Sequence, residues 1–364
     1  MITDNEDVLT EIILWLPVIS LIRFKLVCKR WFSLISSQHF SHLHTLHHHC
    51  HYRSKPEPSS LLLRLIETSN YFNLQGKNWV RYHFSPTLMD PTICSFSNGL
   101  FLLRCLNAEN TPENCYYIYN PTTKQSRNIL LNVNERYKCV MGINLAFDPL
   151  KSPYYKIICI RATRRRSNRF FWGWWQYCQI EVYESETSTW KLCGEPFFAP
   201  HDVCFDQGIY WNDAIHWSGI FFDFHNNFVG EHPEIVLLGP NLTNLFDGNY
   251  IESNGYLHCV AHSPEEKSIS VFELQRDYSE WSLKFHINLD HVPVPLSVLS
   301  IIRRDSEEDS TLVAHQPGKI MVYKFQDSSF NELIDISKEA FYQEGRIQFG
   351  SHCTFQFTKT LAPP

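Results

Sequence analysis

The sequence lacks the motifs of the common nucleotide-binding and hydrolytic enzymes. It contains no Gly-x-Ser-x-Gly nucleophile elbow, no Gly-x-x-x-x-Gly-Lys-Ser/Thr phosphate loop and no His-Glu-x-x-His zinc motif. A glycosidase needs two carboxylates across the scissile bond, and four aspartates do lie close in sequence: Asp202, Asp206, Asp213 and Asp223. Their contexts are equally typical of turns and caps. We therefore predict a protein that is not an enzyme and needs no cofactor.

A strong positive charge and long apolar runs are also missing. The chain has 32 Lys+Arg against 38 Asp+Glu, a formal net charge of −6, which argues against nucleic acid as a general partner. The first eight residues lack the basic and apolar regions of a signal peptide. The apolar run from Ile12 to Ile22 is too short to span a membrane and contains Pro17. We expect a soluble protein of the cytoplasm or nucleus with no membrane partner.

The 12 cysteines are scattered, and no two form a Cys-x-x-Cys pair. Most lie in apolar runs such as residues 157–160, where cysteine behaves as a small buried side chain. Free thiols are the expected state in a reducing compartment. The cysteines therefore predict neither a disulfide framework nor a metal site.

A histidine-rich stretch covers residues 39–52, with seven histidines and Cys50 between His39 and His51. Imidazole and thiolate are good ligands for transition metals, so a metal site is one interpretation. The spacings match no structural-zinc template, and the stretch runs directly into Arg-Ser-Lys-Pro-Glu-Pro-Ser-Ser at 53–60, which is typical of a linker. We favour a solvated connector over residues 46–60 and no metal.

Two apolar stripes with helical spacing lie on either side of Pro17. The first follows Asp7, a candidate N-cap, and consists of Leu9, Ile12, Ile13 and Leu16. The second follows Ser20, another candidate cap, and consists of Leu21, Phe24, Val27, Cys28, Trp31, Leu34 and Ile35. Proline cannot continue a helix because it lacks the N–H group and its ring clashes with the preceding turn. The pattern predicts two short amphipathic helical segments.

These segments resemble the F-box, in particular its plant form. The resemblance covers roughly residues 5–44 and rests on Leu-Pro at 16–17 and Val-Cys-Lys-Arg-Trp at 27–31, with Asn5-Glu6 where the motif usually opens with Leu-Pro. The family implies docking onto a Skp-type adaptor and, through it, onto cullin and RING subunits. The residues that would contact the adaptor or shape that surface are Leu9, Ile12, Ile13, Leu16, Pro17, Leu21, Val27, Cys28 and Trp31. An ordinary helical hairpin is the alternative.

From residue 61 onward the pattern changes to short strands. Asn98-Gly99, Asn212-Asp213 and Asn254-Gly255 precede apolar runs, and such dipeptides tolerate the positive φ of a two-residue hairpin. A second unit, an aromatic strand end followed by a polar turn and another strand, recurs at 117–126, 182–190, 271–281 and 321–330. The steps from 212 to 254 and from 272 to 323 have the length of propeller blades. We predict six blades rather than seven, with a non-repeating β-sandwich as the alternative.

The same region resembles the plant F-box-associated, kelch-like domain, although only 14 glycines are present for kelch-type pairs. The matching motifs include Asn-Gly-Leu at 98–100, Tyr-Asn-Pro-Thr-Thr-Lys-Gln at 119–125 and Asn-Asp-Ala-Ile-His-Trp at 212–217. We expect an α+β multidomain protein with an all-α F-box at 1–45, a connector at 46–60 and an all-β propeller-like domain at 61–364. The resemblance implies a substrate-recognition subunit of an SCF-type ubiquitin ligase, whose propeller holds a protein substrate for ubiquitination.

The most unusual part of the β-region is rich in arginine and tryptophan and spans residues 161–177. Such residues bury large areas at protein interfaces, and they can also hold phosphates and stack on the bases of single-stranded RNA. The candidate substrate-binding residues are Arg164, Arg165, Arg166, Trp172, Trp174 and Trp175. A solvated arginine loop is a third interpretation. An RNA-binding propeller and an F-box adaptor without a ligase function are therefore alternatives.

Overall fold

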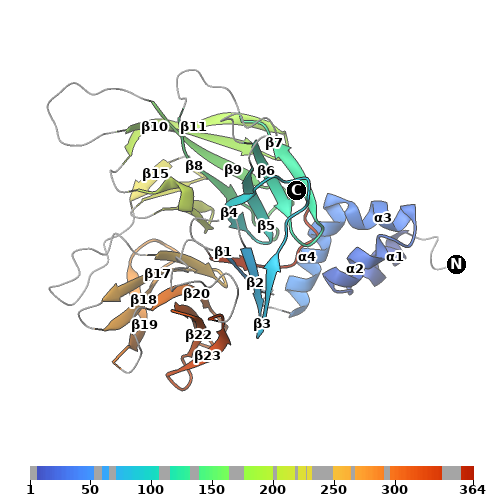
Figure 1. The fold of residues 1–364 in the computed structure, drawn as a ribbon. Coiled ribbons are helices and arrows are strands. Elements are labelled where there is room, and N and C mark those ends of the chain that lie inside the picture. Colours follow the sequence, from blue (N-terminus) through green and yellow to red (C-terminus); the bar gives the residue numbers. More distant parts are fainter. Residues whose placement is uncertain are drawn as a thin grey trace.

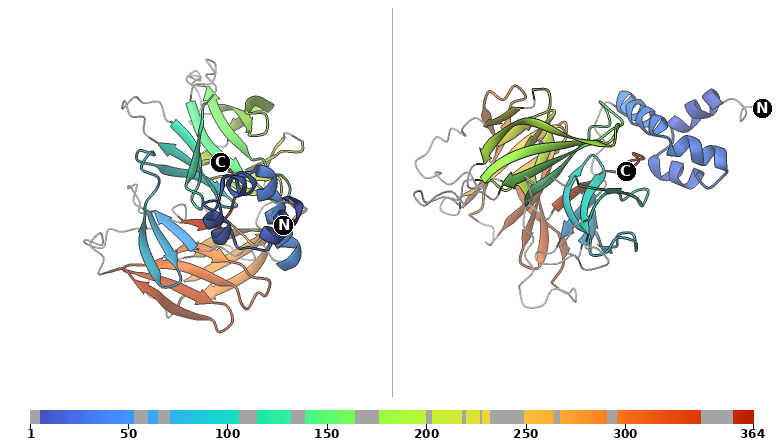
Figure 2. Two further views of the ribbon diagram at one scale, coloured as in Figure 1. Left: turned by 90° about the vertical axis from the view of Figure 1, so that its right-hand side faces the viewer. Right: turned by 90° about the horizontal axis from the view of Figure 1, so that it is seen from above.

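The computed structural model describes residues 6–52, 60–64, 71–105, 115–131, 139–163, 176–199, 203–217, 220–226, 228–231, 249–263, 267–290, 296–337 and 354–364. Within these residues, four helices precede 24 strands (Figure 1). The helices form a separate layer at one end of the β-structure, as two further views show (Figure 2). None of the helices in these ranges has the length and hydrophobicity that crossing a membrane requires.

The helices are α1 (Glu6–Leu14), α2 (Val18–Phe24), α3 (Lys29–Ser36) and α4 (Gln38–Tyr52). Pro17 separates α1 from α2 as predicted, and its backbone is extended at φ −61° and ψ 148°. The second predicted stripe is divided between α2 and α3, because the chain turns after Phe24 and Cys28 is extended at φ −163°. Ser20 consequently lies inside α2 and is not its N-cap. Helical spacing does not reveal this bend, since both helices turn apolar side chains toward one core.

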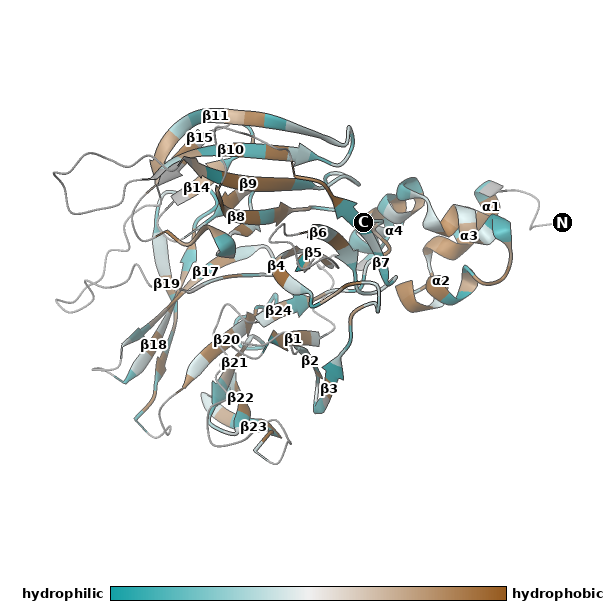
Figure 3. Ribbon diagram, turned by 45° about the horizontal axis from the view of Figure 1, so that its top comes forward, coloured by the Kyte–Doolittle hydropathy of each residue, from teal (hydrophilic) through white to brown (hydrophobic). Residues whose placement is uncertain are grey.

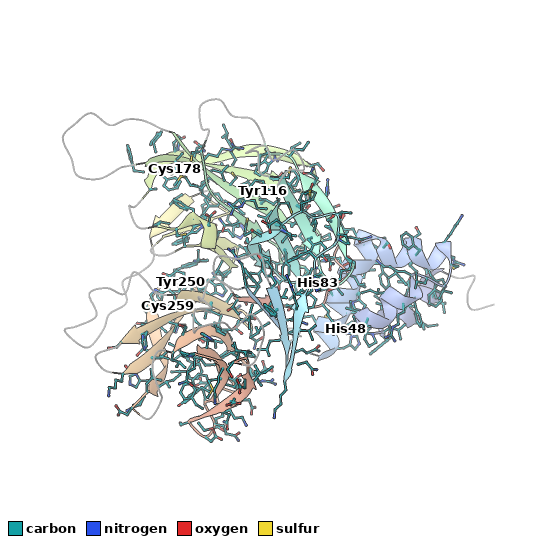
Figure 4. All side chains as sticks on the ribbon, viewed as in Figure 1. His48, His83, Tyr116, Cys178, Tyr250 and Cys259 are labelled. Atoms are coloured by element: carbon teal, nitrogen blue, oxygen red, sulfur yellow. The ribbon has the colours of Figure 1, made fainter. Side chains whose placement is uncertain are left out.

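The histidine-rich stretch is a helix as far as Tyr52, which corrects the expectation of a solvated connector from residue 46. In α4, Nε2 of His44 donates to the Leu16 carbonyl at 2.9 Å. Nε2 of His48, a residue of α4 that is labelled in Figure 4, donates to the Leu14 carbonyl at 3.1 Å. Carbonyl groups at the end of a helix lack partners within it, so these bonds satisfy the end of α1. Histidine favours helices only weakly, and tertiary contacts therefore decide this segment. The domain boundaries at residues 45 and 60 stay predictions.

Six four-stranded antiparallel sheets confirm the predicted six-bladed propeller. Blade 1 consists of β24 (Thr354–Phe357), β1 (Ser60–Arg64), β2 (Tyr71–Gln75) and β3 (Asn78–Tyr82). Blade 2 consists of β4 (Thr92–Ser97), β5 (Leu100–Cys105), β6 (Cys115–Asn120) and β7 (Gln125–Ile129). Blade 3 consists of β8 (Cys139–Ala146), β9 (Lys156–Thr163), β10 (Gln176–Glu184) and β11 (Thr189–Ala199).

The short 3₁₀ helix η2 (Phe205–Gln207) leads from blade 3 into blade 4. Blade 4 consists of β12 (Ile209–Trp211), β13 (Ala214–His216), β14 (Ile220–Asp223) and β15 (Phe228–Glu231). Blade 5 consists of β16 (Asn249–Ser253), β17 (Tyr256–Ser263), β18 (Ser268–Leu274) and β19 (Trp281–Asn288). Blade 6 consists of β20 (Ser297–Ile302), β21 (Thr311–Gln316), β22 (Lys319–Lys324) and β23 (Ser329–Asp335).

The ring of blades closes because blade 1 is built from both ends of the β-region. The strand β24 pairs antiparallel with β1, with Gln356 opposite Leu61. Phe355 of β24 then contacts Phe96 of β4 and Phe101 of β5, at ring-centroid distances of 5.6 and 6.5 Å. Pairing the two terminal strands completes the fourth strand of blade 1, so the ring has no open end and each blade keeps only short, protected edges.

The predicted turns take two recurring places in the blades. The Asn-containing dipeptides join the first and second strands of blades 2, 4 and 5, and the φ values of Asn98, Asn212 and Asn254 are 43°, 49° and 53°. The second unit is the hairpin between the third and fourth strands of blades 2, 3, 5 and 6. Each of its turns includes a residue with positive φ: Lys124, Ser188, Tyr278 and Ser328. Both periodic signals therefore correspond to blade architecture.

Candidate functional site

The exposed apolar side chains concentrate on the N-terminal helices. Seven of the 14 large apolar side chains that are exposed among the described residues lie between residues 8 and 32: Val8, Ile12, Trp15, Ile19, Leu26, Val27 and Phe32. Leu26 is 87% exposed, more than any other of them. Figure 3 shows apolar residues on α1, α2 and α3, the helices that project from the propeller. A concentration of this kind marks an interaction surface.

The nine residues predicted for the adaptor surface divide between the interior and the exterior of the helical unit. Leu9, Ile13 and Leu21 are buried in its core, where they shape the surface from below. Leu16 and Trp31 pack partly against that core, and Trp31 forms an edge contact with Phe24 at 5.2 Å.

The exterior part of the predicted set comprises Ile12, Val27 and the exposed thiol of Cys28. Pro17 lines a cavity on the propeller side. Leu26 and Phe32 share the exposure of Val27 but were not in the predicted set. The sequence offers only one sign that Leu26 could be a contact residue, namely that it is apolar and lies outside the helical stripe. Contact of any of these residues with an adaptor stays a prediction.

Helix α4 attaches the helical unit to blade 3. Nε2 of Gln38 donates to the Pro153 carbonyl at 2.8 Å, and Nδ1 of His42 donates to the Pro149 carbonyl at 2.9 Å. Both carbonyls belong to the loop between β8 and β9. On the opposite side of α4, the rings of His47 and His51 lie 4.4 and 4.5 Å from Trp15 in edge contacts. Both sides of the histidine-rich helix therefore hold it in place.

His44 is the most strongly perturbed histidine of α4. Its pKa is lowered to about 4, chiefly by burial and also by the neighbouring His48 and His47, whereas the bond to Leu16 acts in the opposite direction. A neutral imidazole with Nε2 protonated fits the donor role toward the Leu16 carbonyl. The described residues contain no group of three or more His, Cys, Asp and Glu side chains arranged for a metal ion. His42, His44 and His48 donate to backbone carbonyl groups, and His47 and His51 contact the ring of Trp15.

A cavity of about 760 Å³ lies between α4 and the end of the propeller that faces the helices. Its walls include His44 and His48 of α4, the turn at Asn98, the loop at Asp148, and Arg303 after β20. The connections between the first and second strands of blades 2, 3, 5 and 6 therefore face the helices. The walls carry charged groups of both signs, so the cavity does not favour a ligand of one charge.

The arginine- and tryptophan-rich segment lies outside the described residues at Arg164, Arg165, Arg166, Trp172, Trp174 and Trp175. The strands that flank it are described. The strand β9 starts at Lys156, beside the loop that contacts α4, and runs eight residues to Thr163. Eight strand residues cover roughly 25 Å, so Thr163 lies at the end of blade 3 that is remote from the helices. Beside it, Phe198 is 63% exposed and contacts Tyr177 in a tilted arrangement, with the ring centroids 5.1 Å apart.

Two of the aspartates considered for glycoside chemistry have structural partners. Oδ1 of Asp213 accepts a hydrogen bond from the Tyr210 hydroxyl at 3.0 Å, and Oδ2 forms an ion pair with Lys151. Oδ1 of Asp223 accepts the His225 N–H at 2.7 Å within the turn that follows β14. Asp202 lies outside the described residues. These contacts are those of turn and pairing residues.

A comparison with known protein families gives a match for the N-terminal helices. Residues 5–43 match the F-box domain. The chain therefore combines an N-terminal F-box domain with a six-bladed propeller, and F-box proteins are in general non-catalytic adaptors that bring substrates to SCF ligases.

Plant F-box proteins are similar to this chain over much or all of its length. F-box protein At5g07610 of Arabidopsis thaliana is 27% identical over 412 residues, which cover 100% of this chain and 93% of that protein. Putative F-box protein At5g52610 of Arabidopsis thaliana is 29% identical and covers 76% of each chain. Putative F-box/kelch-repeat protein At1g15680 of the same plant is 54% identical over 43 residues, which cover 12% of this chain and 10% of that protein.

Proposed function

We propose that this chain is a substrate receptor of an SCF-type ubiquitin ligase in the cytoplasm or nucleus. The F-box helices bind a Skp-type adaptor and, through it, the cullin and RING subunits, while the kelch-like propeller binds a protein substrate. The receptor acts by proximity: it holds lysines of the substrate near an activated ubiquitin carried by another subunit, which raises their effective concentration. No residue of the chain takes part in covalent chemistry.

The observation that carries this proposal is the exposed apolar surface of α1–α3. Leu26 and Val27, in the turn between α2 and α3, are 87% and 60% exposed, and Phe32 of α3 is 52% exposed. This part of the chain projects from the propeller. Apolar side chains of this size are unfavourable in water, and burial under a partner recovers about 25 cal/mol for each Å² of apolar area. Their position within the region that matches the F-box domain favours the adaptor as that partner.

The arrangement of the two ends of the propeller supports a division of labour. The F-box domain, α4 and the residues after β24 occupy the end where the first and second strands of the blades connect. The remote end carries the exposed Phe198, its half-buried neighbour Tyr177 and the strand ends that flank the arginine- and tryptophan-rich segment. We assign substrate binding to that remote end, where a bound protein does not collide with the adaptor.

The test measures binding of a purified plant Skp-type adaptor to the full chain by titration calorimetry. We expect stoichiometric binding by the wild type and at least tenfold weaker binding by Leu26→Asp. Leu192→Asp is the matched control, because Leu192 is 64% exposed on the outer strand of blade 3, and its affinity should equal that of the wild type. A folded wild-type chain that does not bind, or equal affinities of both variants, would refute the assignment.

RNA binding by the remote end is the second candidate, favoured only by the composition of residues 161–177. Retention on single-stranded RNA should then fall steeply with salt, and replacing Arg164, Arg165 and Arg166 by alanine should abolish it. Salt-insensitive or absent retention would exclude this candidate. An F-box adaptor without a ligase function would bind the Skp-type adaptor but support no ubiquitin transfer in a reconstituted ligase.

A further inference from the structure

The residues after β24 connect the propeller with the core of the F-box domain. Leu361 is 5% exposed and belongs to the same apolar cluster as Ile13, Leu21 and Ile35, which come from three different F-box helices. The next residue, Ala362, is 3% exposed and packs in the core shared by blades 2 and 3. Consecutive side chains of an extended segment point to opposite sides, so one short stretch fills two separate cores.

A buried asparagine of blade 2 holds this stretch in position. Nδ2 of Asn120 donates to the carbonyl groups of Thr360 and Ala362, at 3.1 and 2.7 Å. Its Oδ1 accepts the N–H groups of Thr122 and Thr123, at 2.8 and 3.1 Å, which fixes the turn after β6. The side chain is fully buried, and its amide therefore links a propeller turn directly to residues 360–362.

The turn between β4 and β5 of blade 2 also packs closely against this stretch. A Cβ atom at Gly99 would lie 2.4 Å from the Thr358 carbonyl oxygen and 2.7 Å from Cγ2 of Thr360. Thr360 N–H also donates to the Thr122 hydroxyl at 3.3 Å. Residues 358–362 are thus fixed by the two turns of blade 2 before they reach the F-box helices.

We infer that residues 358–364 form a strap that completes the F-box core and makes its stability dependent on closure of the propeller. The strap follows β24 directly, and β24 takes its place only when it pairs with β1. The F-box helices precede all the strands in the chain, yet their core lacks Leu361 until the ring has closed. A chain with an open propeller would consequently present a loosened adaptor surface.

The test compares two buried asparagines by hydrogen exchange on the full chain. Asn120→Asp keeps the oxygen that accepts the turn N–H groups but replaces the donor to the strap with an oxygen that repels two carbonyls. We expect at least tenfold faster exchange of the amides in α1–α3, with unchanged exchange in blades 5 and 6. Asn144→Asp is the matched control, because Asn144 is also fully buried and donates to the Phe205 carbonyl at 2.8 Å rather than to the strap.

A second variant addresses the strap from the F-box side. Leu361→Ala removes the side chain from the helical core without touching blade 2, so it stays informative if Asn120→Asp does not fold. We expect the same acceleration of amide exchange in α1–α3. When both changes are combined, the acceleration should be smaller than the product of the two single effects, because both changes release the same strap. Lys359→Ala, on a half-buried strap residue outside that apolar cluster, should leave the helices protected.

The inference is overturned if the helices of Asn120→Asp and Leu361→Ala exchange as slowly as in the wild type. It is also overturned if Asn144→Asp exposes the helices to the same extent. Adaptor affinity provides a second readout that rests on the proposed function, and it should fall with helix protection. Failure of the wild type to bind the adaptor would refute the proposed function. The exchange result would still decide whether the strap stabilises the F-box core.

Discussion

The ion pair between Arg161 and Glu181 provides a quantitative test of how blade 3 is held together. Nε of Arg161 lies 2.8 Å from Oε2 of Glu181, and the side chains are only 6% and 2% exposed. Removing one partner takes the opposite charge away from a buried ion, which typically costs about 3–5 kcal/mol. Replacing both by apolar side chains of similar volume avoids desolvation and is often neutral or stabilising. We therefore expect Glu181→Leu to cost about 4 kcal/mol and Arg161→Met with Glu181→Leu to stay within about 1 kcal/mol of the wild type.

The assay is equilibrium urea unfolding of the full chain, followed by tryptophan fluorescence, for the wild type, both single variants and the double variant. The matched control is the exposed pair of Lys319 and Glu332, at 45% and 44% exposure, where Glu332→Leu should cost less than about 1 kcal/mol. If Glu181→Leu costs less than about 1 kcal/mol, or the two single costs simply add in the double variant, Arg161 and Glu181 do not compensate each other's charge inside blade 3.

Three further predictions concern the F-box domain and its attachment. Leu21→Ala should lower the free energy of unfolding of the helices by about 2–5 kcal/mol, since Leu21 is fully buried, and should weaken adaptor binding only through that loss. Val27→Ala should change the free energy of unfolding by less than about 0.5 kcal/mol in a thermal melt but should weaken adaptor binding. If Leu21→Ala and Val27→Ala change both stability and adaptor affinity equally, the division into core and contact residues is wrong. Because the pKa of His44 is about 4 when folded and near 6.5 when unfolded, proton uptake favours the unfolded state. Stability is therefore full above about pH 6.5 and falls by roughly 3 kcal/mol toward pH 4, a slope that His44→Gln should reduce in melts at stepped pH. Gly99→Ala should destabilise the chain by more than the roughly 1 kcal/mol expected of Gly76→Ala, because both glycines have positive φ but only Gly99 would contact the strap. Equal melting temperatures of the two glycine variants would show that the strap adapts to a Cβ.

Several features of the fold were predictable because they depend on a few neighbouring residues. Asn98 and Gly99 both adopt positive φ, which other residue types adopt only with strain, so the dipeptide located a hairpin correctly. Pro17 separated two helices because no tertiary contact can restore its missing N–H group. The spacing of the two turn types then led to six blades, since each blade repeats the same local geometry.

The candidate site was predictable only in part. Periodicity identified the apolar stripes of the F-box helices, but it does not distinguish Leu21, which is fully buried, from Val27, which is 60% exposed. The difference depends on how α2, α3 and α4 pack against one another. The sequence predicts a connector at residues 46–60 because the histidine-rich segment runs directly into the linker-like residues 53–60. The structure instead provides carbonyl groups at residues 14 and 16 as partners for His48 and His44 of a helix, and no local pattern reveals these partners.

The sequence by itself determined the kinds and order of most elements, two recurring types of turn and the class of the N-terminal domain. These depend on backbone preferences and on apolar spacing within about a dozen residues. Only the tertiary structure decided that β24 completes blade 1, and that Leu361 lies in the core of helices more than 300 residues earlier in the chain. Such contacts carry no local signal, because an extended segment can pair with any edge and an isolated leucine can fill any apolar gap. Their partners are selected when the ring of blades closes and leaves one edge and one gap to be filled.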